Sequence, residues 1–200
     1  MPTQKRYAIA SPTSMGVRMT PEEKLSVHES SLFFMQATSA ETNVLNIASS
    51  LGEECLALTK FVEGSPIARF IQRELRARNI RFEGVSVPQD GPWGFRHQFN
   101  IADSGFGLAG PRVWNDRAGE VGRTLSLDEF DIERIFGVEG VGILHISGLI
   151  AALSPETMEK SARRWAALWN REKGLDYREV KQEMTEGMGR YAGVIRNEEG

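Results

Sequence analysis

The residues best suited to chemistry in this sequence lie in one stretch, GPRVWNDRAGEVGR, at positions 110–123. It carries three arginines, one tryptophan, one asparagine and three glycines, and its only aliphatic residues are two valines and an alanine. Those apolar residues are too few for the core strand of a sheet. An arginine can bind an oxyanion through two parallel N–H···O hydrogen bonds. The stretch therefore predicts contact with an anionic small molecule.

Two other residues with reactive side chains favour structural roles. Cys55 is the only cysteine, which excludes an internal disulfide, and it opens the apolar run CLALTKFV. Free cysteines are commonly buried, so a core thiol is favoured over a nucleophile. His145 lies in the apolar run VGILHIS with no partner suggested by the sequence, which favours a hydrogen-bonded core histidine over a catalytic one.

Composition limits the classes of function. The chain has 200 residues, enough for one sizeable core, and 40% of them are hydrophobic. The 24 Lys and Arg residues against 27 Asp and Glu residues give a net charge of −3, which argues against nucleic-acid binding. No apolar run approaches the roughly 18 residues of a membrane span. The amino-terminal apolar region is too short for a secretory signal, so we expect a cytoplasmic protein with no membrane partner.

Short apolar strands alternate with helical patterns along the chain. Extended runs occupy residues 7–10, 31–36, 55–62, 81–87 and 141–147, and helical patterns occupy 38–52, 65–78, 127–136, 154–169 and 177–188. The run 55–62 is almost continuously apolar, which is typical of a strand covered on both faces. Strands and helices in this order predict right-handed crossovers and a parallel sheet.

Local signals mark where the helices begin. Thr38 followed by Glu41, and Ser126 followed by Glu129, each predict a capping box, in which the two side chains bond each other's free backbone N–H groups. The pair Ser65-Pro66 has the pattern of an N-cap followed by a first-turn proline.

Residues 91–123 have a different character, because glycines interrupt them repeatedly. Between the glycines lie two possible strands, FRHQFNIAD at 95–103 and RVWND at 112–116. Neither is apolar enough for the centre of a sheet. They predict an antiparallel flap added to the parallel core.

Five motifs, in this order, give a family resemblance: TSAETNVLNIASSLG, TKFVEGSPIARFIQRELRARNI, VWNDRAG, ILHISGLIAALSPET and the terminal IRNEEG. With them the chain resembles the ribokinase-like carbohydrate kinases, and most of all the 2-keto-3-deoxygluconate kinases. The resemblance implies an α/β fold, with a doubly wound, mostly parallel sheet and a small antiparallel β lid. Residues 1–200 would form a partial domain, with lid strands near 31–36 and 92–117. It also implies phosphoryl transfer from ATP, with Mg²⁺, to a sugar hydroxyl.

The resemblance also suggests which residues contact a sugar acid. Asn43 matches the asparagine of the family's glycine-glycine-x-x-x-asparagine motif, and Arg117 matches the arginine that meets the acid group. Asn115 and Arg96 fall at or near positions where the family has tyrosines. Ser39, with Thr38, replaces the paired glycines, so its side chain would crowd a sugar or offer it a hydroxyl.

Other departures concern catalysis. The family's Asp-x-Asn-x-Arg strand is missing after the LSPET helix, and Asn197 begins the family's Asn-x-x-Glu motif with Gly200 in place of its glutamate. The segment with the glycine-rich anion hole and the general-base aspartate does not follow. Phosphoryl transfer depends on such positioning and charge neutralisation. We therefore expect no kinase activity, no catalytic residue and no bound ATP or Mg²⁺ in this chain alone, although the complete family enzyme uses both.

Two further classes of function stay open. The chain could be a non-catalytic module derived from such a kinase, which binds a sugar or forms oligomers; a homodimer through the lid or an exposed sheet edge is one possibility. Trp93 and Trp114 could either pack the lid or make that subunit contact. A nucleotide-binding oxidoreductase ranks last, because SPTSMGV rather than GxGxxG follows the first strand.

Overall fold

The structure is a computed structural model, and it describes residues 5–105, 108, 110–157, 164–165 and 167–168. Residues 1–162 form one compact unit and residues 163–200 a second. In the second unit, residues 164–165 and 167–168 are helical. Most of the predicted helix at 154–169 beyond Thr157, the predicted helix at 177–188 and Asn197 lie outside the described residues.

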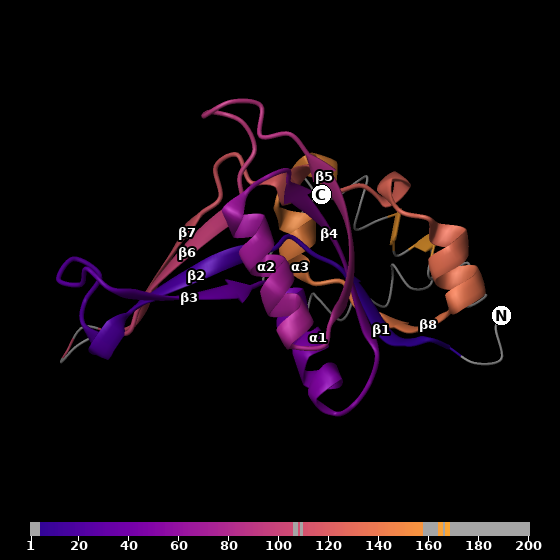
Figure 1. Ribbon diagram of the computed structural model, residues 1–200, viewed down its shortest axis with the longest axis horizontal. Helices are drawn as coiled ribbons and strands as arrows, with labels where there is room; N and C mark the ends of the chain where they lie inside the picture. The colour runs from indigo at the N-terminus through magenta and orange to yellow at the C-terminus, as the bar shows by residue number, and fades with distance from the viewer. Residues whose placement is uncertain (1–4, 106–107, 109, 158–163, 166, 169–200) are drawn as a thin grey trace, which may run out of the picture. The chain divides into compact units, whose positions relative to one another are not determined.

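Sheet A of the first unit is wholly parallel and has the strand order β5–β4–β1–β8 (Figure 1). Its strands are β1 (Tyr7–Pro12), β4 (Cys55–Val62), β5 (Arg81–Val87) and β8 (Val141–Leu144). In register, Ile9 of β1 lies opposite Cys55 on one side and Ile143 on the other. The prediction of an α/β fold built on a parallel sheet is confirmed.

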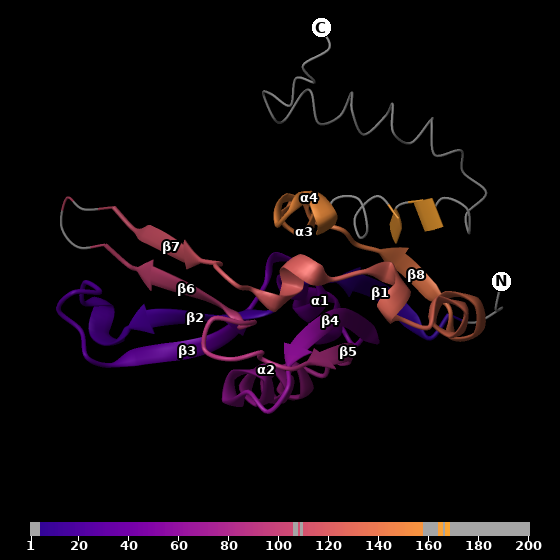
Figure 2. The ribbon, with the colours of Figure 1, turned by 90° about the horizontal axis from the view of Figure 1, so that it is seen from above.

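Two helices pack against one face of sheet A. Helix α1 (Ala40–Ser50) contributes Leu45 and helix α2 (Pro66–Ala77) contributes Ile71 and Leu75, and all three side chains are fully buried. They share a core with Ile9, Cys55, Ala57 and Phe61 of the strands. Ser65 caps α2 as predicted, since its Oγ accepts hydrogen bonds from the N–H groups of Ile67 and Ala68. The short helices α3 (Gly148–Ala152) and α4 (Pro155–Thr157) lie across the sheet from α2 (Figure 2).

Sheet B projects from one end of sheet A in both ribbon views and has the order β3–β2–β6–β7 (Figures 1 and 2). Its strands are β2 (Gly16–Pro21), β3 (Phe33–Thr38), β6 (Gln98–Asp103) and β7 (Arg112–Asp116). The predicted antiparallel pairing of the two strands at 95–103 and 112–116 is confirmed by β6 and β7. Because β2 pairs with β6 in parallel, sheet B as a whole is mixed. Strand β2, which the sequence analysis did not predict, joins the two hairpins.

The segment between sheet B and β8 also differs from expectation. The Ser126–Glu129 capping box forms, but it opens only a single 3₁₀ turn (Leu127–Glu129) before Phe130 turns extended. The chain then makes a wide π-helical turn, Glu133–Glu139. The predicted continuous helix at 127–136 is therefore wrong. Among the described residues, no helix is long and apolar enough to cross a membrane.

Candidate functional site

The candidate site lies where sheet A meets sheet B. The loop after β1 carries Thr13 and Ser14, both buried, and α1 begins beside it. Because parallel strands end at the same edge, the loop after β8 with Ser147 reaches the same place. The carboxyl ends of parallel strands in open α/β sheets are where ligands usually bind.

A buried carboxylate joins these three segments. Glu41, in the first turn of α1, is fully buried, and its Oε2 accepts a hydrogen bond of 2.9 Å from Thr13 Oγ1. Its other oxygen accepts a hydrogen bond from the hydroxyl of Ser147. A buried charge is tolerated only when it is hydrogen-bonded. Glu41 therefore fixes the position of both strand-end loops relative to α1.

Ser39 takes the capping position that the sequence pattern predicted for Thr38. It, rather than Thr38, is the N-cap of α1, because its Oγ accepts a 2.9 Å hydrogen bond from the N–H of Thr42. Its Oγ also lies 2.7 Å from Thr13 Oγ1. The predicted Thr38–Glu41 capping box is thus wrong, since Glu41 bonds Thr13 and Ser147 instead.

Arg117 lies just beyond β7 and is held by a buried acid. Its Nη1 is 3.1 Å from Glu120 Oε2, and Glu120 is almost fully buried while Arg117 is a quarter exposed. Glu120 also accepts a hydrogen bond from Ser14. Since Thr13 contacts Ser39 and the next residue contacts Glu120, this loop connects the two predicted site residues Ser39 and Arg117.

Arg96 lies beside the same turn. Its Nη2 is 2.6 Å from Asp116 Oδ1, and its Nε donates to the carbonyl of Ala118. Its backbone pairs with the turn that holds Glu120, through Arg96 N to Gly119 O at 2.9 Å. The structure therefore brings Arg96 close to Arg117, but its guanidinium braces the end of β7.

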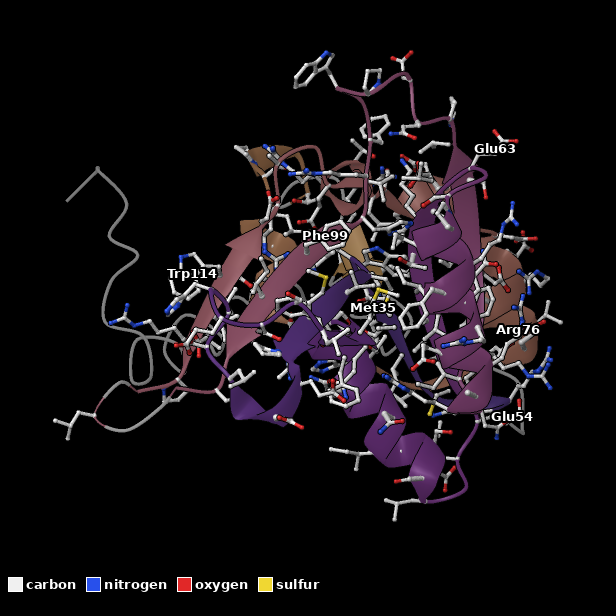
Figure 3. All side chains as sticks on the ribbon, turned by 60° about the vertical axis from the view of Figure 1, so that its left-hand side comes forward. Met35, Glu54, Glu63, Arg76, Phe99 and Trp114 are labelled. Atoms are coloured by element: carbon white, nitrogen blue, oxygen red, sulfur yellow. The ribbon has the colours of Figure 1, made fainter. Side chains whose placement is uncertain are left out.

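One face of sheet B is polar. Strand register places Gln36, Arg18, Asn100 and Asn115 in a row across the four strands. The adjacent row contains Thr38, Gly16 and Gln98, whose side chains point to the same face because alternate residues do. We call these residues the polar face of sheet B. The opposite face carries Met19, Met35, Ile101 and Trp114 (Figure 3).

Gln98 is the least satisfied member of the polar face. The residue is 1% exposed, and within the described part of the chain neither its Oε1 nor its Nε2 has a hydrogen-bond partner. Asn100 Oδ1 is also buried without one. Gln98 lies over Gly16, where a Cβ would come within 2.0 Å of its Cγ. A buried unpaired amide costs about 1–3 kcal/mol unless another group satisfies it.

Two other predicted site residues are accessible. Asn43 is exposed on α1, one turn after Ser39, and its N–H bonds Ser39 O at 3.3 Å. Asn115 is exposed on β7 opposite Asn100. Trp114 is 53% exposed on the other face of β7, and Trp93 is almost fully exposed in the loop after β5. His145 is half-buried directly after β8, with its N–H bonded to Ala10 O.

A buried histidine joins the two sheets. His97 Nε2 accepts a 3.3 Å hydrogen bond from the N–H of Val62 in β4, and its Nδ1 lies 3.0 Å from Met15 O, next to β2. These contacts require the neutral imidazole with the proton on Nδ1. Burial lowers the pKa of His97, and the hydrogen bond to Met15 raises it by less.

Several functional candidates escaped the sequence analysis. Glu41 and Glu120 were not predicted because the hydroxyl groups that bond them lie 28 to 106 residues away in sequence; only Arg117, three residues from Glu120, is a local partner. Gln98 was concealed within a strand-like run. A cavity of about 220 Å³ beside Glu120 is lined by Arg123 and Ser154 among others. In the described ranges, no three His, Cys, Asp or Glu side chains gather closely enough to hold a metal ion.

Comparison with known proteins adds the fold family. No protein-family model matches the sequence, and no curated protein matches it. A PfkB-family carbohydrate kinase from Listeria grayi has a TM-score of 0.70 and 21% identity over 84% of this chain and 49% of its own. The 2-dehydro-3-deoxygluconokinase of Thermotoga maritima has a TM-score of 0.69 and 20% identity over 84% of this chain and 49% of its own.

A third solved structure carries a nucleotide. A sugar kinase from Pyrococcus horikoshii, solved in complex with ATP, has a TM-score of 0.64 and 18% identity, covering 80% of this chain and 48% of its own. The chain thus spans about half the length of the structures it resembles. At these identities the similarity establishes the fold, which is the one that the sequence motifs predicted.

Proposed function

We propose that these residues form the sugar-binding and lid portion of an ATP-dependent sugar-acid kinase of the 2-keto-3-deoxygluconate type. The fold similarity to carbohydrate kinases supports the class of reaction. Sheet B would act as the lid, with its polar face toward the sugar. Asn43, Asn115 and Ser39 would contact hydroxyls, Arg117 the carboxylate, and Arg96 would hold the end of β7 in place.

The buried, unpaired amide of Gln98 is the observation that carries the proposal. A sugar hydroxyl both donates and accepts, so it could pair with either end of that amide and with Asn100 Oδ1. Arg117 adds a positive charge that is a quarter exposed and already oriented by Glu120. A polyhydroxy acid offers matching chemistry to both groups: hydroxyls for the amides and a carboxylate for the guanidinium.

Calorimetric titration with 2-keto-3-deoxygluconate tests the assignment. The change Arg117→Lys keeps a cation for Glu120 but removes the two-pronged N–H geometry, so binding should weaken at least about tenfold. Arg112→Lys is the matched control, because Arg112 lies at the other end of the adjoining strand β7, opposite Asp103. Equal affinities for the parent and Arg117→Lys would show that Arg117 is not the acid-binding residue.

ATP and Mg²⁺ enter this proposal only through the complete enzyme. When bound, they supply the transferred phosphoryl group and neutralise its charge. We expect this chain alone to bind the sugar acid without phosphorylating it. A coupled assay for ADP release, run with the same sugar acid, separates the two steps, and turnover by this chain would contradict the expectation.

An oligomerisation module is the alternative, and the apolar face of sheet B favours it. Trp114 is 53% exposed and Met35 38% exposed on that face, which Figure 3 shows directed outward beside α2. A homodimer through this lid surface would cover both. Light scattering of the parent should then give twice the monomer mass, and Trp114→Gln should shift the species toward monomer. Trp93→Gln, at a loop position away from sheet B, should leave the mass unchanged; a monomeric parent would exclude the dimer.

A further inference from the structure

A second cavity lies at the opposite edge of sheet A, where β1, β4 and β5 begin. Its volume is about 540 Å³, and Tyr7, Leu56 and Arg81 contribute one lining residue from each of these strands. Because the strands are parallel, this amino-terminal edge is separated by the length of the sheet from the candidate sugar site. Helix α2 ends at the cavity, and the turn Glu133–Glu139 forms another wall.

The lining of this cavity carries an excess of positive charge. Four arginines (Arg6, Arg76, Arg81 and Arg134) line it together with only two glutamates, Glu83 and Glu139. The phenol of Tyr7 adds no negative charge near neutral pH, because burial, and then its hydrogen bond to Glu139, raise its pKa. Two more carboxylates lie just outside the lining: Glu54 is 3.7 Å from Arg6 and 3.9 Å from Arg81, and Asp131 is 3.7 Å from Arg134. The cavity is therefore distinguished by how many guanidinium donors remain unused, and not by its net charge.

Two of the arginines are already occupied. Arg134 Nη2 donates to both oxygens of Glu83, at 2.7 and 2.6 Å, and its Nη1 is 3.0 Å from Glu139 Oε1. Arg6 Nη1 shares that same oxygen of Glu139 at 2.9 Å. Hydrogen bonds to Glu83 and then Glu139 raise the pKa of Arg134. These contacts fix Arg134 and Arg6 as part of the cavity wall, so we do not expect them to bind a ligand.

The other two arginines have unused donors. The guanidinium carbon of Arg76 stacks 5.2 Å from the centre of the Phe82 ring, and within the described part of the chain it contacts no carboxylate. Stacking on a ring face orients the guanidinium while leaving its in-plane N–H groups free. Arg81 has only a long contact, with its Nε 3.9 Å from Glu54 Oε2, and Glu54 is shared with Arg6 at 3.7 Å. Figure 3 shows Arg76 and Glu54 on the side of the molecule away from Trp114.

We propose that this cavity binds a phosphate-type oxyanion, with Arg76 and Arg81 as the two clamping residues. The several oxygens of such a group can accept from two guanidinium groups that approach from different elements, Arg76 from α2 and Arg81 from β5. A lone phosphate would leave most of the 540 Å³ empty, so the volume admits the organic part of a phosphate monoester. The site is separate from the sugar site and does not depend on that proposal.

Calorimetry on the full chain at constant ionic strength tests the site, with inorganic phosphate and glycerol 3-phosphate as probes. Both should bind saturably, and the double variant Arg76→Gln/Arg81→Gln should bind at least tenfold more weakly. Arg73→Gln is the matched control: Arg73 lies on the same helix, stacks on Phe70 at 4.9 Å and lies outside the lining. Arg117→Lys should also leave phosphate binding unchanged, which separates this site from the sugar site.

The relative affinities of the two probes identify the ligand class. Tighter binding of glycerol 3-phosphate would assign a phosphate ester as the ligand, whereas equal affinities would assign the phosphate group alone. Affinity in the double variant within twofold of the parent, or heat that never saturates with either probe, would overturn the proposal. Among the described residues, Arg76 and Arg81 make no carboxylate contact closer than 3.9 Å, so the double variant should fold, and its circular dichroism spectrum checks this.

Discussion

All eight residues of β4 in sheet A are buried, whereas all five residues of β7 in sheet B are exposed. Sheet A is covered by α1 and α2 and shares one continuous core with them. Sheet B is buried mainly at its end next to sheet A, where Val17 and Ala37 join that core and Gln98 is also covered. Burial of apolar area is the main stabilising term in folding. The comparison therefore assigns most of the stability to sheet A and little of it to the exposed strand β7 of sheet B.

The largest expected difference in the free energy of unfolding is between matched phenylalanine substitutions in the two sheets. Phe61 in β4 is 2% exposed and packs edge-on against Phe82 at 5.7 Å, while Phe34 in β3 is 60% exposed. Phe61→Ala should lower the free energy of unfolding by about 3–5 kcal/mol, because it leaves a core cavity. Phe34→Ala should change it by less than about 0.5 kcal/mol. Urea denaturation measures both; comparable losses would show that sheet B carries as much stability as sheet A.

One ion pair in each sheet region allows a second comparison of stability. Lys60 in β4 is 6% exposed and pairs with Glu129 while also donating to Thr124 O at 3.0 Å. Arg96 and Asp116 beside sheet B are 41% and 53% exposed. Lys60→Met should lower the free energy of unfolding by about 1–3 kcal/mol, since it removes the ion-pair partner of the largely buried Glu129 carboxylate. Arg96→Gln should cost no more than about 1 kcal/mol.

A double variant decides the origin of the Lys60 effect. If the cost arises from the unpaired acid, Lys60→Met/Glu129→Gln should recover part of the stability lost in Lys60→Met, as measured by urea denaturation. No recovery would mean that the aliphatic stem of Lys60 and its bonds to Thr124 account for the loss instead.

The difference in burial between sheet A and sheet B also explains how much of the fold could be predicted from the sequence. The almost continuously apolar run at 55–62 and the apolar stripe of α2 predict that these elements are buried, because apolar residues dominate the faces that pack in the core. Strand β2 escaped prediction because Arg18 and Thr20 interrupt its apolar residues and its identity depends on partners far along the chain. Sheet A could thus be predicted from local pattern, and sheet B only in part.

The candidate site shows the same limit at the scale of single residues. The pattern Thr38-x-x-Glu41 satisfies the capping-box rule, but the adjacent Ser39 takes the cap and leaves Glu41 for Thr13 and Ser147. Arg117 could be singled out from composition and family resemblance. Its orientation by Glu120 and Ser14 could not, because Ser14 lies 106 residues from Glu120.

The contact between the two sheets offers the smallest and most specific test. The pKa of His97 is lowered by burial, so the unfolded chain takes up a proton more readily than the folded one as the pH falls below about 6.5. Its contribution to stability is therefore complete above that pH and is lost as the pH falls toward the lower pKa of the folded state, by at most about 1.4 kcal/mol per pH unit. Protonation would also cost the bond from Val62 N, since Nε2 could no longer accept it.

His97→Gln keeps an acceptor for Val62 and a donor for Met15 but cannot titrate. Urea denaturation at pH 7 and pH 5 should show a smaller loss of stability for this variant than for the parent. His28→Gln, at an exposed position between β2 and β3, is the matched control and should behave as the parent does. If the parent and His97→Gln lose the same stability between the two pH values, the joint between the sheets does not titrate. The acid sensitivity of the chain must then arise from other titratable groups.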